Sequence, residues 1–365
     1  MKILSLGLDN SILDKNSSLA SRVVEYGQLV EKYVIVVPCS KYQEEELSAK
    51  VKVYGSGGAN KLIRLLKVYQ LAKKILAEEK YDLITVQDQY YLALIGWRLA
   101  KRFNLGLEIQ VHGIEEHHFL RKLAARFVIP KADAIRAVSQ RMKNQLIREF
   151  GARENKIIVV PIYIKTQNSK LKTQSDNLKL KTDKKKFVFL TVGRLAPVKN
   201  ISLQIEAMAE VIKKYPQLEL WIIGEGAERN KLELKTKNYK LETNIKFLGW
   251  HDNLEEFYQQ ADVFLLTSNS EGWGLAVVEA ASYGLPIIMT DVGLAGEAIK
   301  NNESGIIVLI NNKKELAKAM VELIKDEALR KNLGAGAKQA VLSLPNKEQT
   351  LELYKQSWQK AALKN

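Results

Sequence analysis

The sequence has one cysteine in 365 residues and lacks long apolar runs. A single thiol, Cys39, cannot form an intramolecular disulfide or supply a cysteine cluster for a metal. No apolar run approaches the roughly 18 residues that a membrane-spanning helix needs, and no cleavable signal pattern follows Met1. We therefore expect a cytoplasmic globular protein in which Cys39 is a small buried residue at a strand end.

Acidic residues are scarce in the first half of the chain. Residues 1–164 contain 26 lysines and arginines against 17 acids, and residues 165–186 contain 8 against 2. Residues 187–365 contain 22 of each, so the net charge of +15 lies entirely in the first half and the segment that follows it. This asymmetry indicates that one domain faces an anionic partner.

Short Val/Ile/Leu-rich segments alternate with longer amphipathic ones, which predicts parallel sheets covered by helices on both faces. We predict an α/β protein with two Rossmann-like domains, residues 1–164 and 187–365, joined by a lysine-rich linker or loop at 165–186. The expected strands of the first domain are 2–7, 33–38, 83–86, 107–111, 134–138 and 157–160. Those of the second are 187–192, 218–223, 245–248, 262–267, 287–290 and 306–309.

Residues 271–279, EGWGLAVVE, place two carboxylates around a glycine-rich turn. A buried strand is expected before the turn, a short helix opens from it, and a further strand follows. Backbone N–H groups at the helix start suit an anion, and Gly272 and Gly274 permit its close approach. Glu271 and Glu279 would then accept hydrogen bonds from hydroxyls beside that anion. A phosphate next to a polyol describes a nucleotide sugar.

This stretch resembles the E-x7-E motif of retaining glycosyltransferases of family four (glycosyl transferases group 1). Their GT-B fold has two Rossmann-like domains that face each other across a deep cleft, and the C-terminal helix often crosses back to the first domain. Further motifs follow in the order of that family: VHG at 111–113, ADAIRAVS at 132–139, TVGRL at 191–195 with Lys199, WIIGEG at 221–226, FLG at 247–249, ADV at 261–263 and DVG at 291–293 with Glu297.

The resemblance implies roles for individual residues. Arg194 and Lys199 would grip the donor phosphates, Glu271 the sugar hydroxyls, and Glu279 the ribose. His112, at the end of an expected strand, would contact the transferred sugar, so that His112, Arg194, Lys199 and Glu271 form the catalytic set. The remaining donor-binding positions are Gly193, Gly224, Gly226, Gly249, Gly272, Trp273, Gly274 and Leu275.

The implied reaction is a hexosyltransferase-like retaining transfer from a nucleotide-diphosphate sugar to a glycan or lipid-linked acceptor, in cell-surface polysaccharide or glycolipid synthesis. The leaving diphosphate would accept the acceptor's proton. The family needs neither metal nor cofactor here, and no Asp-x-Asp motif is present. A metal site built from His112, His117 and His118 with Glu115 and Glu116 is the less favoured alternative. A sugar-nucleotide epimerase of the same fold and a basic nucleic-acid-binding protein remain alternative functions.

Two segments depart from the family pattern. The usual Gly-Gly loop after the first strand is replaced by DKNSSL at 14–19, where Ser17 or Ser18 can cap the next helix. The usual Pro-Asn-Gly-Val-Asp at the end of the first domain is replaced by PIYIK at 161–165. In the resembling family these two segments supply the first domain's phosphate contact and the interdomain hinge contact, and this sequence departs from the family pattern at both.

A helix predicted at 60–79 carries many basic residues. Its apolar stripe (Leu62, Leu65, Leu66, Tyr69, Ala72 and Leu76) is expected to face the core, and its lysines to face solvent. A second interpretation is peripheral association of the basic N-terminal domain with an anionic membrane at the inner face of the cell membrane. Apolar anchors would come from residues 119–127.

Overall fold

The computed structural model describes residues 1–114, 119–163 and 186–363. The predicted linker therefore lies outside the described residues, apart from Lys186. The alternative metal ligands Glu115, Glu116, His117 and His118 lie outside them as well. Within the described part of the chain, no helix has the length and apolar character needed to cross a bilayer.

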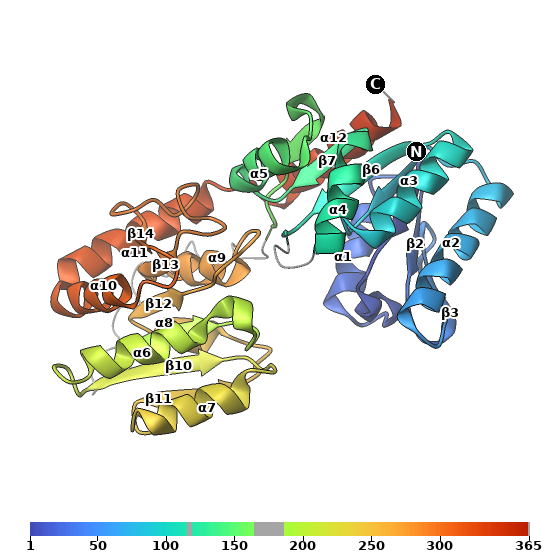
Figure 1. Cartoon of the computed structure of the whole chain (residues 1–365). Helices are drawn as coiled ribbons and strands as arrows, with labels where there is room; N and C mark the ends of the chain where they lie inside the picture. The colour runs from blue at the N-terminus through green and yellow to red at the C-terminus, as the bar shows by residue number, and fades with distance from the viewer. Residues whose placement is uncertain (115–118, 164–185, 364–365) are drawn as a thin grey trace. The chain divides into compact units, whose positions relative to one another are not determined.

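The chain forms two compact units, each with its own sheet (Figure 1). The first unit joins residues 1–161 to 346–365, and the second comprises 162–345. The last helix thus belongs to the first unit, although the chain reaches it only after completing the second.

The first unit contains a sheet of eight described strands in the order β3-β4-β2-β1-β5-β6-β7-β8. Neighbouring strands are parallel except β3 and β4, which form an antiparallel hairpin at one edge. The strands are β1 Lys2–Leu6, β2 Lys32–Val37, β3 Tyr42–Ser48, β4 Val51–Ser56, β5 Leu83–Val86, β6 Gly106–Val111, β7 Ala134–Ala137 and β8 Ile157–Val159.

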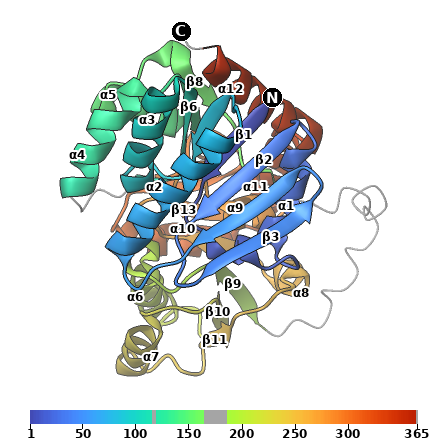
Figure 2. The same ribbon diagram turned by 90° about the vertical axis from the view of Figure 1, so that its right-hand side faces the viewer.

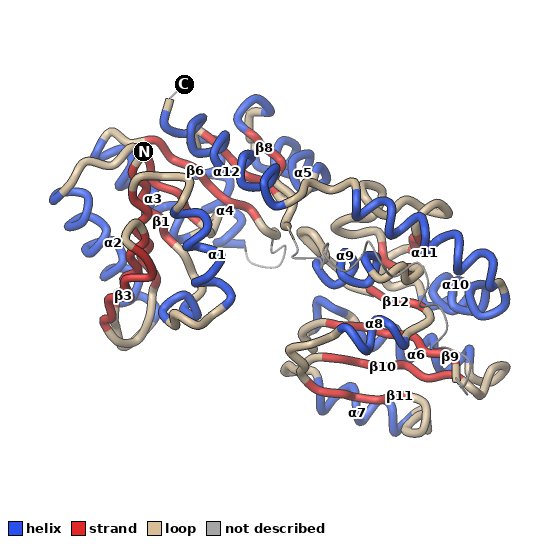
Figure 3. Tube along the Cα trace, turned by 180° about the vertical axis from the view of Figure 1, so that it is seen from behind, coloured by secondary structure: helices blue, strands red, loops and turns tan. Residues whose placement is uncertain are grey.

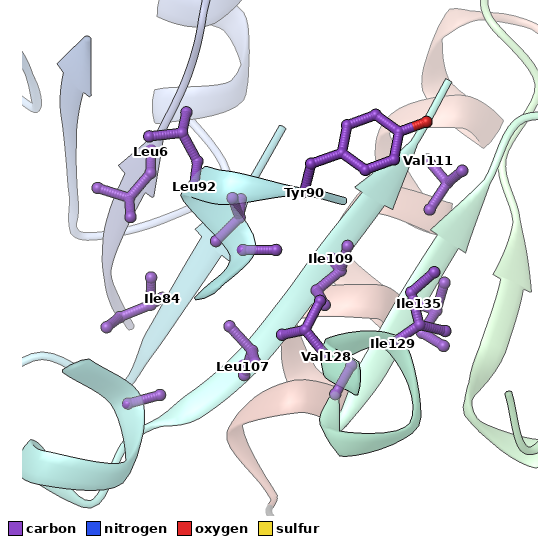
Figure 4. Close-up of a cluster of buried hydrophobic side chains, with 14 of the residues drawn as sticks. Leu6, Ile84, Tyr90, Leu92, Leu107, Ile109, Val111, Val128, Ile129 and Ile135 are labelled. Carbon is purple, nitrogen blue, oxygen red and sulfur yellow. The ribbon is translucent and has the colours of Figure 1, made fainter. Parts of the chain in front are cut away.

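Helices cover both faces of this sheet, as the alternation of apolar strands and amphipathic segments predicts. Figure 2 shows α2 to α5 on one face and α1 with α12 on the other. Figure 4 shows part of the core beneath the first group, including Leu107, Ile109 and Val128. The helices are α1 Ser18–Gly27, α2 Lys61–Glu78, α3 Tyr91–Phe103, α4 Phe119–Val128, α5 Gln140–Phe150 and α12 Lys347–Ala362.

Two details of these helices bear on the sequence-based expectations. Ser17 caps α1 by accepting a 3.0 Å hydrogen bond from the Ala20 N–H, which confirms the expected cap. The predicted core-facing stripe of α2 is wrong in its first two turns, because Leu62 and Leu66 are 69% and 55% exposed. The fully buried part of the helix begins only at Val68.

Helix α12 is held on the first sheet by a buried polar cluster as well as by apolar packing. Arg136 of β7 lies 3.6 Å from the Glu108 carboxylate of β6 and 3.7 Å from the centroid of the Tyr354 ring on α12. Ser357 of α12 donates a hydrogen bond to the same carboxylate. Trp358 is fully buried beside Tyr33. Ser357 and Tyr354 of α12 thus contact the two partners of a buried ion pair within the sheet, and these contacts tie the helix to β6 and β7.

The second unit has six described strands, all parallel, in the order β11-β10-β9-β12-β13-β14 (Figure 3). The strands are β9 Phe187–Val192, β10 Leu218–Ile223, β11 Ile245–Gly249, β12 Val263–Leu266, β13 Ile287–Thr290 and β14 Gly305–Val308. The helices are α6 Ile201–Val211, α7 Arg229–Asn238, α8 Glu255–Gln260, α9 Leu275–Ser282, α10 Lys313–Lys325 and α11 Glu327–Leu342.

Candidate functional site

The strand order of the second unit identifies where a ligand would bind. The chain starts at β9 in the middle, runs outward through β10 and β11, and then returns to β12 on the other side of β9. In open parallel sheets the crevice for ligands lies at the carboxyl ends of the strands where this reversal occurs. The loops after β9 and β12 meet there, and they contain Arg194, Lys199 and Glu271.

Backbone hydrogen bonds hold the loop after β9 in place. The Gly193 N–H donates to the Ile223 carbonyl over 2.9 Å, and the Leu195 N–H donates to the Glu225 carbonyl over 2.9 Å. Farther along, the Thr267 hydroxyl donates to the Asn200 carbonyl over 3.0 Å. The loop is therefore anchored at both ends.

Glycine at position 224 is a steric requirement. A Cβ there would lie 2.0 Å from the Gly193 carbonyl oxygen, and the backbone φ of Gly224 is +131°. A Cβ at Gly226 would lie 2.3 Å from the Leu195 carbonyl oxygen. The Gly224 N–H also donates to the Gly249 carbonyl over 2.7 Å. The predicted donor-binding glycines after β9, β10 and β11 therefore form one tightly packed group of loops.

Lys199 and Glu271 form an ion pair at the candidate site. Lys199 Nζ lies 2.5 Å from Glu271 Oε1, and the Ser268 hydroxyl donates to the same oxygen over 2.7 Å. The side chains are 24% and 12% exposed, so both remain accessible at the rim of the loops. Arg194 is exposed. The arrangement provides cations for phosphate oxygens next to an acceptor for hydroxyl groups.

The start of α9 has no side-chain cap. Its N-cap is Gly274, with a φ of +105°, which offers no side chain for the first backbone N–H groups. Trp273 is 2% exposed, and its indole N–H has no partner among the described residues. The Trp273 carbonyl accepts a 3.1 Å hydrogen bond from the Leu294 N–H, which fixes the turn that includes Gly272 and leads into Leu275. Uncapped N–H groups at a helix start are suited to an anion.

Glu279 lies inside α9, where the sequence predicts it. The Tyr258 hydroxyl of α8 donates to Glu279 Oε2 over 2.8 Å, and the Tyr258 ring stacks on Tyr283 at 5.3 Å between centroids. Burial raises the pKa of the Glu279 carboxyl, whereas the hydrogen bond from Tyr258 acts in the opposite direction. Burial also raises the pKa of Tyr258, so this hydroxyl stays protonated and remains a donor.

His112 belongs to the first unit and is described there alone. It directly follows β6, its side chain is exposed, and the next residue, Gly113, accepts a 2.5 Å hydrogen bond from the Gln89 amide. The carboxyl end of a parallel strand is the position that the sequence predicts for it.

The second unit thus brings Lys199 and Glu271 into contact and positions Glu279 on the helix that follows. Sequence reasoning missed the two residues that hold the carboxylates, Ser268 and Tyr258. No sequence pattern marks Ser268 as a partner of Glu271 or Tyr258 as a neighbour of Glu279. The roles that the resemblance gives to the site residues remain predictions.

Solved structures of the same fold cover almost the whole chain. Sucrose-phosphate synthase from Thermosynechococcus elongatus has a TM-score of 0.79 at 20% identity and covers 99% of both chains. The crystal structure of Anabaena HepE in complex with UDP has a TM-score of 0.75 at 20% identity and covers 98% of both chains. Together with the two parallel-sheet units, these similarities confirm the predicted GT-B fold class.

Family models match both units. One described as Glycosyltransferase Family 4 matches residues 28–168, and one described as Glycosyl transferases group 1 matches residues 172–340. The chain therefore belongs to the GT-B glycosyltransferases of the family-four type, as the resemblance indicates.

Curated relatives are moderately similar. The alpha-monoglucosyldiacylglycerol synthase of Acholeplasma laidlawii is 26% identical over 357 residues, which is 90% of this chain and 87% of that protein. An Escherichia coli enzyme, UDP-Gal:alpha-D-GlcNAc-diphosphoundecaprenol alpha-1,3-galactosyltransferase, is 28% identical over 284 residues, 73% of this chain and 71% of that protein. The N-acetyl-alpha-D-glucosaminyl L-malate synthase of Bacillus anthracis is 26% identical over 234 residues, 63% of this chain and 60% of that protein.

Proposed function

We propose that this glycosyltransferase moves a sugar, with retention of anomeric configuration and without a metal, from a nucleotide-diphosphate sugar to a glycan or lipid-linked acceptor. Synthesis of cell-surface polysaccharide or glycolipid is the setting that such acceptors imply. The observation that carries the proposal is the pair of Lys199 and Glu271 at the strand reversal of the second sheet, 2.5 Å apart. A cation for phosphate there adjoins a carboxylate for sugar hydroxyls.

Similar proteins support the two substrate classes. The Anabaena HepE structure holds UDP, and another crystal of the same protein holds UDP-glucose. The relatives from Acholeplasma and Escherichia coli are named for a diacylglycerol product and an undecaprenol-linked substrate. A uridine nucleotide is therefore the first donor to test, and a lipid-linked acceptor the first acceptor class.

In the proposed reaction, the bond between the anomeric carbon and the diphosphate oxygen breaks while the acceptor oxygen bonds to the same face of that carbon. The leaving phosphate takes the proton of the acceptor hydroxyl. Negative charge grows on the diphosphate as the bond breaks, so Arg194 and Lys199 stabilise the transition state more than the ground state. Glu271 orients the sugar through its hydroxyls, and Glu279 binds the ribose. His112 is assigned to the transferred sugar by resemblance.

Association with an anionic membrane would bring a lipid-linked acceptor to the enzyme. It is consistent with the net charge of +9 in residues 1–164, against zero in 187–365. A purely soluble glycan acceptor would not need such a charge. The membrane association is therefore part of the proposal.

A thermal-shift screen of UDP, GDP, ADP and their common sugars tests donor binding. We expect one nucleotide series to raise the Tm, with the shift unchanged by EDTA and lost in Arg194→Ala. The matched control is Lys213→Ala, which removes an exposed cation just beyond the C-terminal end of α6, at the amino ends of the strands.

NMR of the anomeric proton in the product then reports retention or inversion. An inverted product, or binding that requires a divalent metal, contradicts the mechanism. Conversion of the donor sugar to its epimer without any acceptor would favour the epimerase.

A further inference from the structure

The first unit exposes several large apolar side chains in the first two turns of α2 and along α4. Phe119 is 79% exposed, Leu62 69% and Leu120 68%. We call the whole group the apolar edge, which comprises Leu62, Ile63, Leu66, Phe119, Leu120, Leu123 and Phe127.

The exposure in α2 follows from the lengths of the elements. A helix of 18 residues is about 27 Å long, whereas the six-residue strands β2 and β4, on which α2 packs, extend about 20 Å. Its first turns therefore extend beyond the sheet, and burial begins only at Val68. A soluble protein gains nothing from leucines in such a projecting segment, since exposed apolar patches mark interaction sites.

The parallel topology places both helix starts at one edge of the sheet. Helices α2, α3 and α4 each follow the carboxyl end of a strand and lie side by side on one face (Figure 2). Between the two exposed groups, Lys61 Nζ lies 5.8 Å from the Tyr91 ring centroid at the start of α3. The same edge holds His112, directly after β6.

Among the described residues of α2 and α4, the charges beside the apolar edge are mostly positive, although Lys122 lies 3.7 Å from the carboxylate of Glu149 on α5. Helix α4 contains Arg121, Lys122 and Arg126 and no acid, and α2 has no acid in its first turn but exposes Lys61 and Lys67. A helix start favours acids, so Lys61, Arg121 and Lys122 in the first turns oppose the helix dipole, whereas Arg126 lies in the last turn of α4, where a cation is favourable. These cations fit a negatively charged partner that lies on the same surface.

We propose that the apolar edge docks on an anionic lipid bilayer, with its leucines and phenylalanines in the interfacial region and the flanking cations on the headgroups. A second copy of this chain fits less well, because the cationic surroundings of both patches would repel each other. The docking presents the edge with His112 to lipid-linked acceptors. That consequence rests on the proposed function, whereas docking itself is measured without donor or acceptor.

Co-sedimentation with vesicles tests the proposal on the full chain. We expect the protein to bind phosphatidylcholine vesicles that contain about 30% phosphatidylglycerol, and to bind vesicles of phosphatidylcholine alone more weakly. The pair Leu62→Ser and Leu66→Ser should lower the partition coefficient by about tenfold or more, because two leucines lose their transfer to the interface. Lys61→Glu with Lys67→Glu should abolish the preference for anionic vesicles, and high salt should weaken it.

The control is Leu234→Ser on α7, which removes a leucine that is 60% exposed in the second unit. It should bind vesicles as the unaltered chain does. An unchanged Tm and unchanged nucleotide binding in the α2 variants show that folding and the donor site are intact.

Vesicle binding that is insensitive to the α2 substitutions, or equal on both vesicle types, overturns the proposal. A dimer in solution that these substitutions dissociate, without vesicle binding, assigns the apolar edge to a second copy instead. Vesicle binding without nucleotide binding would leave docking standing and remove the proposed function.

Discussion

Replacement of Glu271 by glutamine should separate nucleotide binding from sugar binding. Glu271 Oε1 lies 2.5 Å from Lys199 Nζ and accepts a further hydrogen bond from Ser268. A nucleoside diphosphate that enters must share Lys199 with this carboxylate and tolerate its charge. Glu271→Gln keeps the shape of the side chain and removes the charge. We therefore expect the substitution to strengthen binding of the nucleoside diphosphate alone.

The size of the effect follows from the geometry. Two unit charges about 4 Å apart attract by about 4 kcal/mol at an effective dielectric constant near 20. Since Lys199 and Glu271 are 24% and 12% exposed, we reduce this to about 1–2 kcal/mol. The Kd of the nucleoside diphosphate should then fall by about 5- to 30-fold. The sugar loses an ionised acceptor worth about 1.5–3 kcal/mol. The preference for nucleotide sugar over nucleotide should therefore fall by about 10- to 150-fold.

Isothermal titration calorimetry of the preferred nucleoside diphosphate and its sugar, at moderate ionic strength, measures both affinities. Glu233→Gln is the matched control, because it neutralises an exposed glutamate on α7 that pairs with Arg229. It should change neither affinity. If Glu271→Gln weakens nucleotide and nucleotide sugar equally, the carboxylate does not compete for Lys199 and the reasoning fails.

Three further outcomes concern the same unit. Tyr258→Phe removes the hydroxyl that lowers the pKa of Glu279, so the pH below which nucleotide affinity falls should become higher. Tyr283→Phe keeps that hydroxyl and should leave the pH dependence of nucleotide affinity unchanged. Burial raises the pKa of Glu279 above the ordinary value of about 4.3. The stability associated with the protonated carboxyl is therefore fully present below that ordinary value and is lost as the pH rises through the raised pKa. Glu279→Gln should therefore raise the Tm more at pH 8 than at pH 4 while weakening nucleotide binding; a Tm gain independent of pH would refute this. Gly224→Ala should cost about 2–4 kcal/mol in the free energy of unfolding, whereas Gly296→Ala, at a φ of +76° but with open space around it, should cost less.

The parallel strands were predictable because they are buried on both faces and appear as short apolar runs. All six strands of the second sheet start and end within about two residues of their expected positions. Strands β3 and β4 were both missed, because neither contains an apolar run. Strand β4 is parallel to β2 but alternates apolar and polar residues, as in Val51, Lys52 and Val53. Strand β3 is an exposed edge strand with three successive glutamates, 44–46, so it has no apolar run to detect. A charged edge strand resists pairing with another chain, which explains its composition but hides it in the sequence.

The misplaced stripe on α2 has a different physical origin. Leu62 and Leu66 continue the helical period of Tyr69 and Ala72, and the period alone cannot show where the sheet beneath the helix ends. Helix length relative to strand length is a property of the assembled unit. The sequence therefore predicts the apolar face of α2 correctly, but it wrongly places the first two turns of that face against the core.

The partners of the two carboxylates show what a motif leaves undetermined. Glu271 Oε1 accepts from both Lys199 and Ser268, and Glu279 Oε2 accepts from Tyr258. In each case one oxygen is engaged, and the other accepts no hydrogen bond from the described residues. A donor hydroxyl can therefore meet Glu271 Oε2 and Glu279 Oε1 without breaking these contacts. The motif predicts which carboxylates bind the donor, and the neighbours from the β9 loop, the β12 loop and α8 determine which oxygen of each one stays available for the proposed ligand.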